Sequence, residues 1–358
     1  MKEISSQKIP GNANKMVLSN GVSTSQFADA VVNCGTDLLA REAYFPEKFE
    51  MIPNRHLILV LGMKRSGTSA LTKGLEVMGV SLGNHLMPPN EFNKKGYWED
   101  WDFHELNFEM LKASTQNRAR RILPLSEKET TYLLSSHYAE RATQLLVEKI
   151  FPEQQFAVKV PTSSLLLPFW KKICEQHSIA LSFVIALRNP ISVANSVERS
   201  FEDLQEKSFW IWIASLLSSL THSEGYGRVL VDYDELIQDP SHEMRRVAAA
   251  LHLKIDEERL RNYSHHFMDP SLRHQFVQDY HFENDDLCLK LAIEMYDELL
   301  FVARDQKSLH DLAKPLQQWS RKFSSVQGLL KMLEMHEFTI AKLVDANVAL
   351  RDKLSLFN

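Results

Sequence analysis

The sequence is poor in cysteine. Three residues, Cys34, Cys174 and Cys288, are spread over 358 positions, so they form neither a pairing framework nor a cluster with the spacing of metal ligands. A reducing compartment is the simplest expectation from this usage. The same pattern predicts no metal site.

Long apolar runs are missing as well. The N-terminal stretch MKEISSQKIPGNANK has no apolar core of the kind that secretory signals carry. The most apolar later run, FWIWIASLLSSL (209–220), is shorter than the ~20 residues needed to span a bilayer. We therefore expect a soluble, cytoplasmic protein with no transmembrane segment.

The chain has no excess of positive charge. It holds 41 Lys and Arg against 46 Asp and Glu, a formal net charge of −5. This balance argues against a general nucleic-acid binder or a protein of anionic membrane surfaces, although one local cationic pocket remains compatible with it. Hydrophobic residues make up 44% of the chain, which is ordinary for a globular protein.

The sequence does contain several short apolar runs, and each is followed by a segment with the apolar spacing of a helix. Continuous apolar runs are typical of strands buried on both faces, and strands that alternate with helices favour a parallel sheet. The runs are HLILVLG (56–62), QFAVKV (155–160), LSFVIAL (181–187) and RVLVDYD (228–234). We predict an α/β fold, a three-layer α/β/α arrangement with a P-loop-like strand–loop–helix and an all-helical C-terminal extension.

Three segments follow from this pattern. Residues 1–50 form a poorly specified leader with one helix expected near Ser25–Glu42, residues 51–282 form the α/β domain, and residues 283–358 form the helical extension. After Pro315 the extension carries a heptad-like apolar seam at positions 316, 319, 323, 326, 330, 333, 340 and 344, interrupted by Glu337. Either a long helix packs on its own domain, or it forms a coiled coil with a partner or in a homodimer.

The segment GMKRSGTS (62–69) resembles a phosphate-binding loop between a strand and a helix. Its glycines, Gly62 and Gly67, have the G-x-x-x-x-G spacing, but the lysine that follows the second glycine in ATP-binding loops is absent. Backbone N–H groups and the helix dipole favour an anion in such a turn. The remaining residues Lys64, Arg65, Ser66, Thr68 and Ser69 add cations and hydroxyls, although a structural turn without a ligand is the alternative.

A second segment, RNPISVANS (188–196), begins where a predicted strand ends. Asn189 is a suitable N-cap and Pro190 a suitable first helical residue. Arg188 then lies at the ligand-binding edge expected of a parallel sheet, and Ser196 follows about two helical turns later. Taken alone, Arg188 could pair with a carboxylate and Ser196 could lie on an ordinary helix surface.

Together the two segments resemble the sulfotransferases that use 3′-phosphoadenosine 5′-phosphosulfate (PAPS), most closely their bacterial branch. RSGTS (65–69) matches the loop that binds the 5′-phosphosulfate, and RNPISVANS matches the segment that binds the 3′-phosphate. The segments MPPNEFNKKGYWED (87–100) and LVDYDELIQDP (230–240) also resemble family segments, so the resemblance covers roughly residues 56–275. Two departures are Ala70, where the cytosolic enzymes have an aromatic residue that stacks on adenine, and KVPTS (159–163), which keeps Lys159 but lacks the arginine of K-D-P-R.

The resemblance implies the reaction. A sulfuryl group would pass in line from PAPS, the co-substrate, to a hydroxyl or amine of a small-molecule, glycan or lipid-linked acceptor. Lys64 to Ser69 would bind the phosphosulfate, Arg188 and Ser196 the 3′-phosphate, and Arg65 would stabilise the leaving oxygen. Residues 80–150 and 200–225 would form the acceptor pocket.

Transfer also needs a base for the acceptor proton. Glu99, which matches the glutamate of the family's G-Y-x-E segment, is the first candidate, and His104 and then Asp102 are the alternatives. The aromatic neighbours Tyr97 and Trp98 are expected to desolvate Glu99 and raise its pKa.

Two other functions remain open. A non-catalytic nucleotide-binding protein could present its C-terminal helix to a partner. A P-loop kinase for a small molecule could hold Mg²⁺ through Asp232, but the absence of a lysine after Gly67 argues against it.

Overall fold

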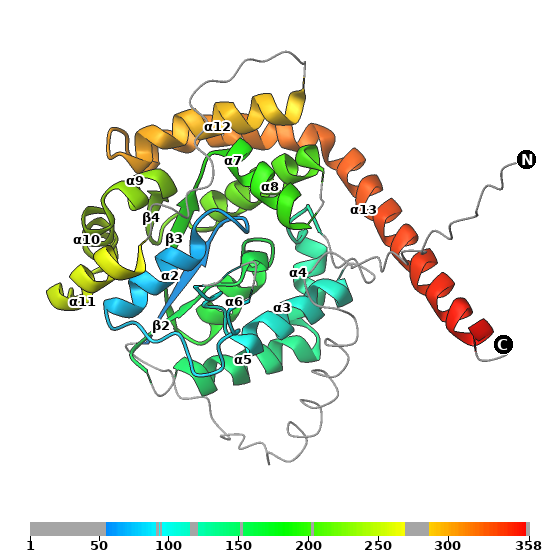
Figure 1. Cartoon of the computed structure of the whole chain (residues 1–358), viewed down its shortest axis with the longest axis horizontal. Helices are drawn as coiled ribbons and strands as arrows, with labels where there is room; N and C mark the ends of the chain where they lie inside the picture. Colours follow the sequence, from blue (N-terminus) through cyan, green and yellow to red (C-terminus); the bar gives the residue numbers. More distant parts are fainter. Residues whose placement is uncertain are drawn as a thin grey trace, which may run out of the picture. The chain divides into compact units, whose positions relative to one another are not determined.

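The computed structural model describes residues 55–90, 93, 95–114, 121–150, 153–201, 204–268 and 286–355 (Figure 1). The N-terminal leader and the helix expected near Ser25–Glu42 lie outside these residues. Among the described helices, none is both long and apolar enough to cross a membrane.

The predicted parallel sheet is confirmed. In the described residues it consists of β1 (His56–Leu61), β2 (Gln155–Val158), β3 (Ala180–Leu187) and β4 (Gly227–Asp232), in the order β2-β1-β3-β4. Strand β1 pairs with β2 on one side and β3 on the other, and Leu187 of β3 is in register with Asp232 of β4. All carboxyl ends therefore lie at one edge of the sheet.

Side chains of β1 alternate between two separate cores, which gives the three layers predicted from the sequence. Ile58 and Val60 belong to one core, and Leu57, Leu59 and Leu61 to the other. The first core is covered by α2 (Thr68–Val77), α9 (Tyr233–Gln238), α10 (Pro240–Leu251) and α11 (Glu257–Asn262). The second is covered by α3 (Trp101–Ser114), α4 (Glu127–Leu134), α5 (His137–Ile150), α6 (Leu167–Gln176), α7 (Pro190–Phe201) and α8 (Gln205–His222).

Short helical turns complete the fold. They are η1 (Pro161–Ser164), directly after the end of β2, the π-helical turn η2 (Tyr263–Phe267) and η4 (Leu309–Leu312), which precedes the last helix.

The C-terminal region is helical, as predicted, and consists of α12 (Leu287–Ala303) and α13 (Ala313–Ser355). Helix α12 packs against α8, and the first part of α13 also contacts α8. Three residues of α13, Trp319, Phe323 and Leu330, are buried in the second core, which also holds Leu57, Leu59 and Leu61 of β1. The first half of the predicted seam thus packs on the chain itself, whereas Ile340 in the second half is 61% exposed.

Candidate functional site

The turn between β1 and α2 has an unusual backbone. Arg65 and Gly67 both adopt positive φ angles, 73° and 89°, and Gly67 caps the N-terminus of α2. Such a conformation is costly for a residue with a Cβ, and a Cβ on Gly67 would also lie 2.3 Å from Cδ2 of Tyr233. The first N–H groups of α2 have no intrahelical partners and carry the positive end of its dipole, so this turn suits an anion.

The second turn, between β3 and α7, is built as the sequence predicts. The side-chain Oδ1 of Asn189 accepts hydrogen bonds from the backbone N–H groups of Ile191 and Ser192, both at 3.1 Å. Pro190 is the first residue of α7. This cap holds Arg188 at the carboxyl end of β3 and directs α7 away from the sheet edge.

Direct hydrogen bonds join the two turns. Nη1 of Arg188 donates to the backbone oxygen of Arg65 at 2.7 Å, and Nε of Arg65 donates to Oγ of Ser196 at 2.9 Å. Residues more than 120 positions apart are thereby brought into one cluster. The structure places Arg65, Arg188 and Ser196 at the same edge of the sheet.

The cluster is cationic and partly shielded from water. Burial lowers the pKa of Arg65, the phenols of Tyr97 and Tyr233 oppose this shift, and the guanidinium of Arg199 adds to it. Arginine nevertheless stays protonated in proteins. The guanidinium of Arg188 lies 4.3 Å from the ring centroid of Tyr233. Tyr233 and Arg199 were not identified from the sequence as part of this cluster. Arg199 could have been found, because it lies one helical turn after Ser196 and therefore on the same side of the helix.

A buried chain of charged groups lies beside the loop. Nζ of Lys159 donates to Oε1 of Glu99 at 2.6 Å, and both side chains are almost completely buried. The same Nζ lies 3.4 Å from Oγ of Ser69, which belongs to the loop. Nδ1 of His104 lies 3.4 Å from the other oxygen of Glu99. Glu99 and His104, which the sequence offered as alternatives, are therefore direct neighbours.

The expected rise in the pKa of Glu99 is wrong. Burial does act to raise it, but the charge of Lys159 and the nearby imidazole of His104 outweigh burial, so the pKa is lowered. The aromatic neighbours have other contacts: Tyr97 Oη donates to Asn90 Oδ1 at 2.8 Å, and Trp98 packs edge-on against Phe267. Glu99 is consequently an ionised carboxylate at neutral pH.

The other predicted residues of the turn between β1 and α2 differ in burial and contacts. Thr68 is buried as the first residue of α2, and Lys64 is half-buried. Oγ of Ser66 is buried and has no hydrogen-bond partner among the described residues. Oγ of Ser69 donates to the backbone oxygen of Tyr97 at 3.2 Å, which ties the loop to the segment that carries Glu99.

Asp102 was considered as a base and Asp232 as a ligand for Mg²⁺, and both make other contacts in the structure. Asp102 pairs with Lys149 at 2.5 Å and with His85 at 3.0 Å. Asp232 caps α9, and burial together with Asp234 raises its pKa to about 7. Within the described ranges, His, Cys, Asp and Glu side chains form no group of three that could hold a metal ion.

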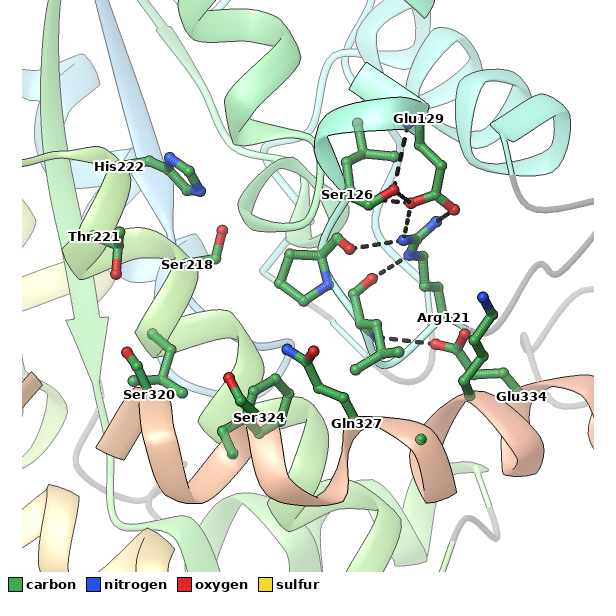
Figure 2. Close-up of a pocket in the computed structure, with 17 residues that line it drawn as sticks. Arg121, Ser126, Glu129, Ser218, Thr221, His222, Ser320, Ser324, Gln327 and Glu334 are labelled. Carbon is green, nitrogen blue, oxygen red and sulfur yellow. Dashed lines mark hydrogen bonds and ion pairs between the residues drawn. The ribbon is translucent and has the colours of Figure 1, made fainter. Parts of the chain in front are cut away.

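One cavity, of about 450 Å³, lies between the segment around Arg121, the end of α8 and α13 (Figure 2). Its lining includes Ser218, His222, Gln327 and Glu334, and no residue of the two turns. The residues that line this cavity are thus different from those of the cluster formed by Arg65, Arg188 and Ser196.

Comparison with known proteins gives one family. A family model described as the sulfotransferase family matches residues 58–257, a range that holds both turns, Glu99 and His104. Among solved structures, the chain is similar to the sulfotransferase domain from the Synechococcus PCC 7002 olefin synthase, with 17% sequence identity and a TM-score of 0.39. That match covers 71% of this chain and 98% of the other. No curated protein matches the chain.

Proposed function

The chain belongs to the sulfotransferase family, and from that premise we propose that it transfers a sulfuryl group from PAPS to a hydroxyl or amine of an acceptor. The observation that carries the choice of donor is the pair of hydrogen bonds from Arg188 to Arg65 and from Arg65 to Ser196. A ligand with two anionic groups a short distance apart could present one group to each turn. PAPS has this property, with a phosphosulfate at one end and a 3′-phosphate at the other.

Each turn would hold one end of the donor. Residues 64–69 and the N-terminus of α2 would bind the phosphosulfate through backbone N–H groups and through the planar guanidinium of Arg65. Arg188 and Ser196 would bind the 3′-phosphate, with Arg199 adding positive potential from α7. The ring of Tyr233 lies against the Arg188 guanidinium and would hold it in place before the donor arrives.

In the transfer step, the acceptor oxygen or nitrogen forms a bond to sulfur as the bond from sulfur to the bridging oxygen breaks. The electron pair of the broken bond stays on the bridging oxygen, which remains with the nucleotide. Arg65, whose guanidinium is partly desolvated, would stabilise the charge that grows there. Lys159, 3.4 Å from Ser69, would be the second cation near the transferred group.

The acceptor proton would go to the Glu99–His104 pair. Glu99 is held by Lys159, and this ion pair makes the carboxylate less basic. A histidine oriented by a carboxylate is a common arrangement for a base. We therefore assign proton removal to His104 and orientation of its ring to Glu99, with direct removal by Glu99 as the alternative.

The proposed acceptor is a small molecule, a glycan or a lipid-linked molecule with a free hydroxyl or amine. A transfer experiment tests this function. The full chain is incubated with PAPS carrying labelled sulfur and with metabolite, glycan and lipid extracts, and products are identified by mass spectrometry. We expect labelled products with the wild type and at least about 100-fold less with Arg188→Ala. Arg245→Ala is the matched control, since Arg245 is an exposed residue that pairs with Glu257.

A different outcome would change the assignment. If the wild type binds the nucleotide but labels nothing in any extract, the chain is a non-catalytic nucleotide-binding protein. If Arg188→Ala and Arg245→Ala reduce labelling equally, the second turn has no part in the reaction.

A further inference from the structure

Helix α13 is anchored to the protein along its first half. Nε1 of Trp319 donates to Glu294 of α12 at 3.2 Å, and Phe323 packs against Trp210 with ring centroids 6.1 Å apart. Near the end of this half, the carboxylate of Glu334 accepts hydrogen bonds from the backbone N–H groups of Ile122 and Leu123, at 2.5 and 2.9 Å. Figure 2 shows Glu334 beside the segment around Arg121. These contacts fix which face of the helix is turned to the protein.

The last anchoring contact is an ion pair one turn further on. Nζ of Lys207 in α8 lies 2.5 Å from Oε1 of Glu337. Beyond Glu337 the helix continues to Ser355. Several apolar side chains of this second half are exposed: Ile340 to 61%, Leu343 to 63% and Leu350 to 59%.

A second seam, mostly apolar, runs along an exposed side of α13 next to the face that packs on the protein. It passes through Leu329, Leu333, His336, Ile340, Leu343, Asn347 and Leu350, all of which are exposed. The steps alternate between four and three residues over about three heptads, which is the spacing of a coiled coil. We call these residues the outer seam. It shares Leu333 and Ile340 with the seam predicted from the sequence, whose first half is buried.

We propose that the outer seam binds the outer seam of a second copy of this chain in a parallel two-stranded coiled coil. In heptad terms, Leu333, Ile340 and Asn347 occupy the a positions. The d positions hold Leu329, His336, Leu343 and Leu350. Ile340 at one a position, together with leucine at three of the four d positions, is the combination that favours two parallel strands.

Asn347 is the reason for choosing a second copy as the partner. An asparagine at a single a position is satisfied when it faces another asparagine, because each amide can both donate and accept. A parallel pair of identical helices places Asn347 opposite Asn347. A partner with an apolar residue at this level would leave the buried amide without a hydrogen bond, which is costly.

The flanking positions are compatible with this pairing. In a parallel pair, each g residue faces the e residue five positions later on the other helix. Beyond the anchored half these pairs are Thr339 with Val344 and Ala346 with Arg351, and the preceding pair joins Met332 to Glu337, which already pairs with Lys207 of its own chain. None of them brings together two charges of the same sign. None of the outer-seam residues belongs to the proposed catalytic site.

The test compares two substitutions on the full chain by analytical ultracentrifugation. The wild type is expected to be a dimer at tens of micromolar. Leu343→Asp places a charge in the seam and is expected to raise the dissociation constant at least about 100-fold. Val348→Asp is the matched control, because Val348 is 52% exposed on the same helix but outside the seam, and we expect it to remain a dimer.

A cross-linking experiment tests direction and register. Asn347→Cys should form a dimer linked through this cysteine on mild oxidation, whereas Val348→Cys should not. A monomeric wild type, or a dimer that survives Leu343→Asp, would overturn the proposal. A dimer in which Asn347→Cys fails to cross-link would overturn the parallel arrangement. Circular dichroism of each variant confirms that the helix content is unchanged.

Discussion

Replacing Arg65 with alanine is expected to lower kcat for sulfuryl transfer by about 10²–10³-fold, the range measured when one preorganised donor to a developing oxyanion is lost. Arg65 is held in a strained backbone conformation at φ 73° and hydrogen bonds to Ser196. Strain of this kind persists where the surroundings fix it, often because the site needs it. The measurement is the initial rate with labelled PAPS under saturating donor.

The comparison with Arg65→Lys separates charge from geometry. Lysine keeps the positive charge but lacks the planar fork, so we expect a loss between those of the wild type and alanine variants. The fall in kcat should exceed the fall in affinity for the product nucleotide, since the leaving charge exists only in the transition state. An alanine variant with unchanged kcat would remove Arg65 from the chemistry.

The second large effect is expected at His104. If this residue takes the acceptor proton, His104→Ala should lower kcat by about 10²–10⁴-fold, the usual contribution of a general base. His85→Ala is the matched control, because His85 also pairs with a carboxylate, Asp102, but is outside the proposed mechanism. Equal activity of the two variants would exclude His104 as the base.

The pH profile distinguishes the two candidate bases. Because the pKa of Glu99 is lowered, its carboxylate is ionised throughout the neutral range, and a Glu99 base predicts no acidic limb near neutrality. An acidic limb near neutrality, in which the rate falls as pH decreases, would therefore indicate a base other than the Glu99 carboxylate. We expect this limb in kcat of the wild type.

Glu99 itself is tested best in combination with His104. Glu99→Gln leaves Lys159 buried without its counter-charge, which costs about 3–5 kcal/mol, so thermal unfolding must accompany the kinetics. If Glu99 acts by orienting His104, the double variant should be no slower than His104→Ala alone. If the fold-loss in kcat of the double variant equals the product of the two single fold-losses, the two groups act separately.

Much of the fold could be predicted from the sequence because of where the strands lie. Strands buried on both faces appear as continuous apolar runs, and all four predicted runs coincide with β1 to β4. The start of α7 could also be predicted, since Asn189 and Pro190 together mark a helix N-terminus. The strand order could not, because it depends on how the connections cross the sheet.

The site was less accessible to sequence reasoning. The two turns could be recognised by their motifs, but the contacts of Glu99 depend on Lys159, 60 positions later, whose charge reverses the expected pKa shift. Periodicity likewise revealed an apolar seam on α13 without showing what covers it. Half of that seam is buried against α8 and α12, and the outer seam became apparent only when the buried face was known.

The most direct test of the account is calorimetric titration of the full chain with 3′-phosphoadenosine 5′-phosphate, 5′-AMP and 3′-AMP. If both turns hold one nucleotide, the bisphosphate should bind at least about 100-fold more tightly than either monophosphate. In Arg188→Ala, the affinities for the bisphosphate and for 5′-AMP should become nearly equal. Equal affinity of the wild type for all three nucleotides, or no binding of any, would contradict the account.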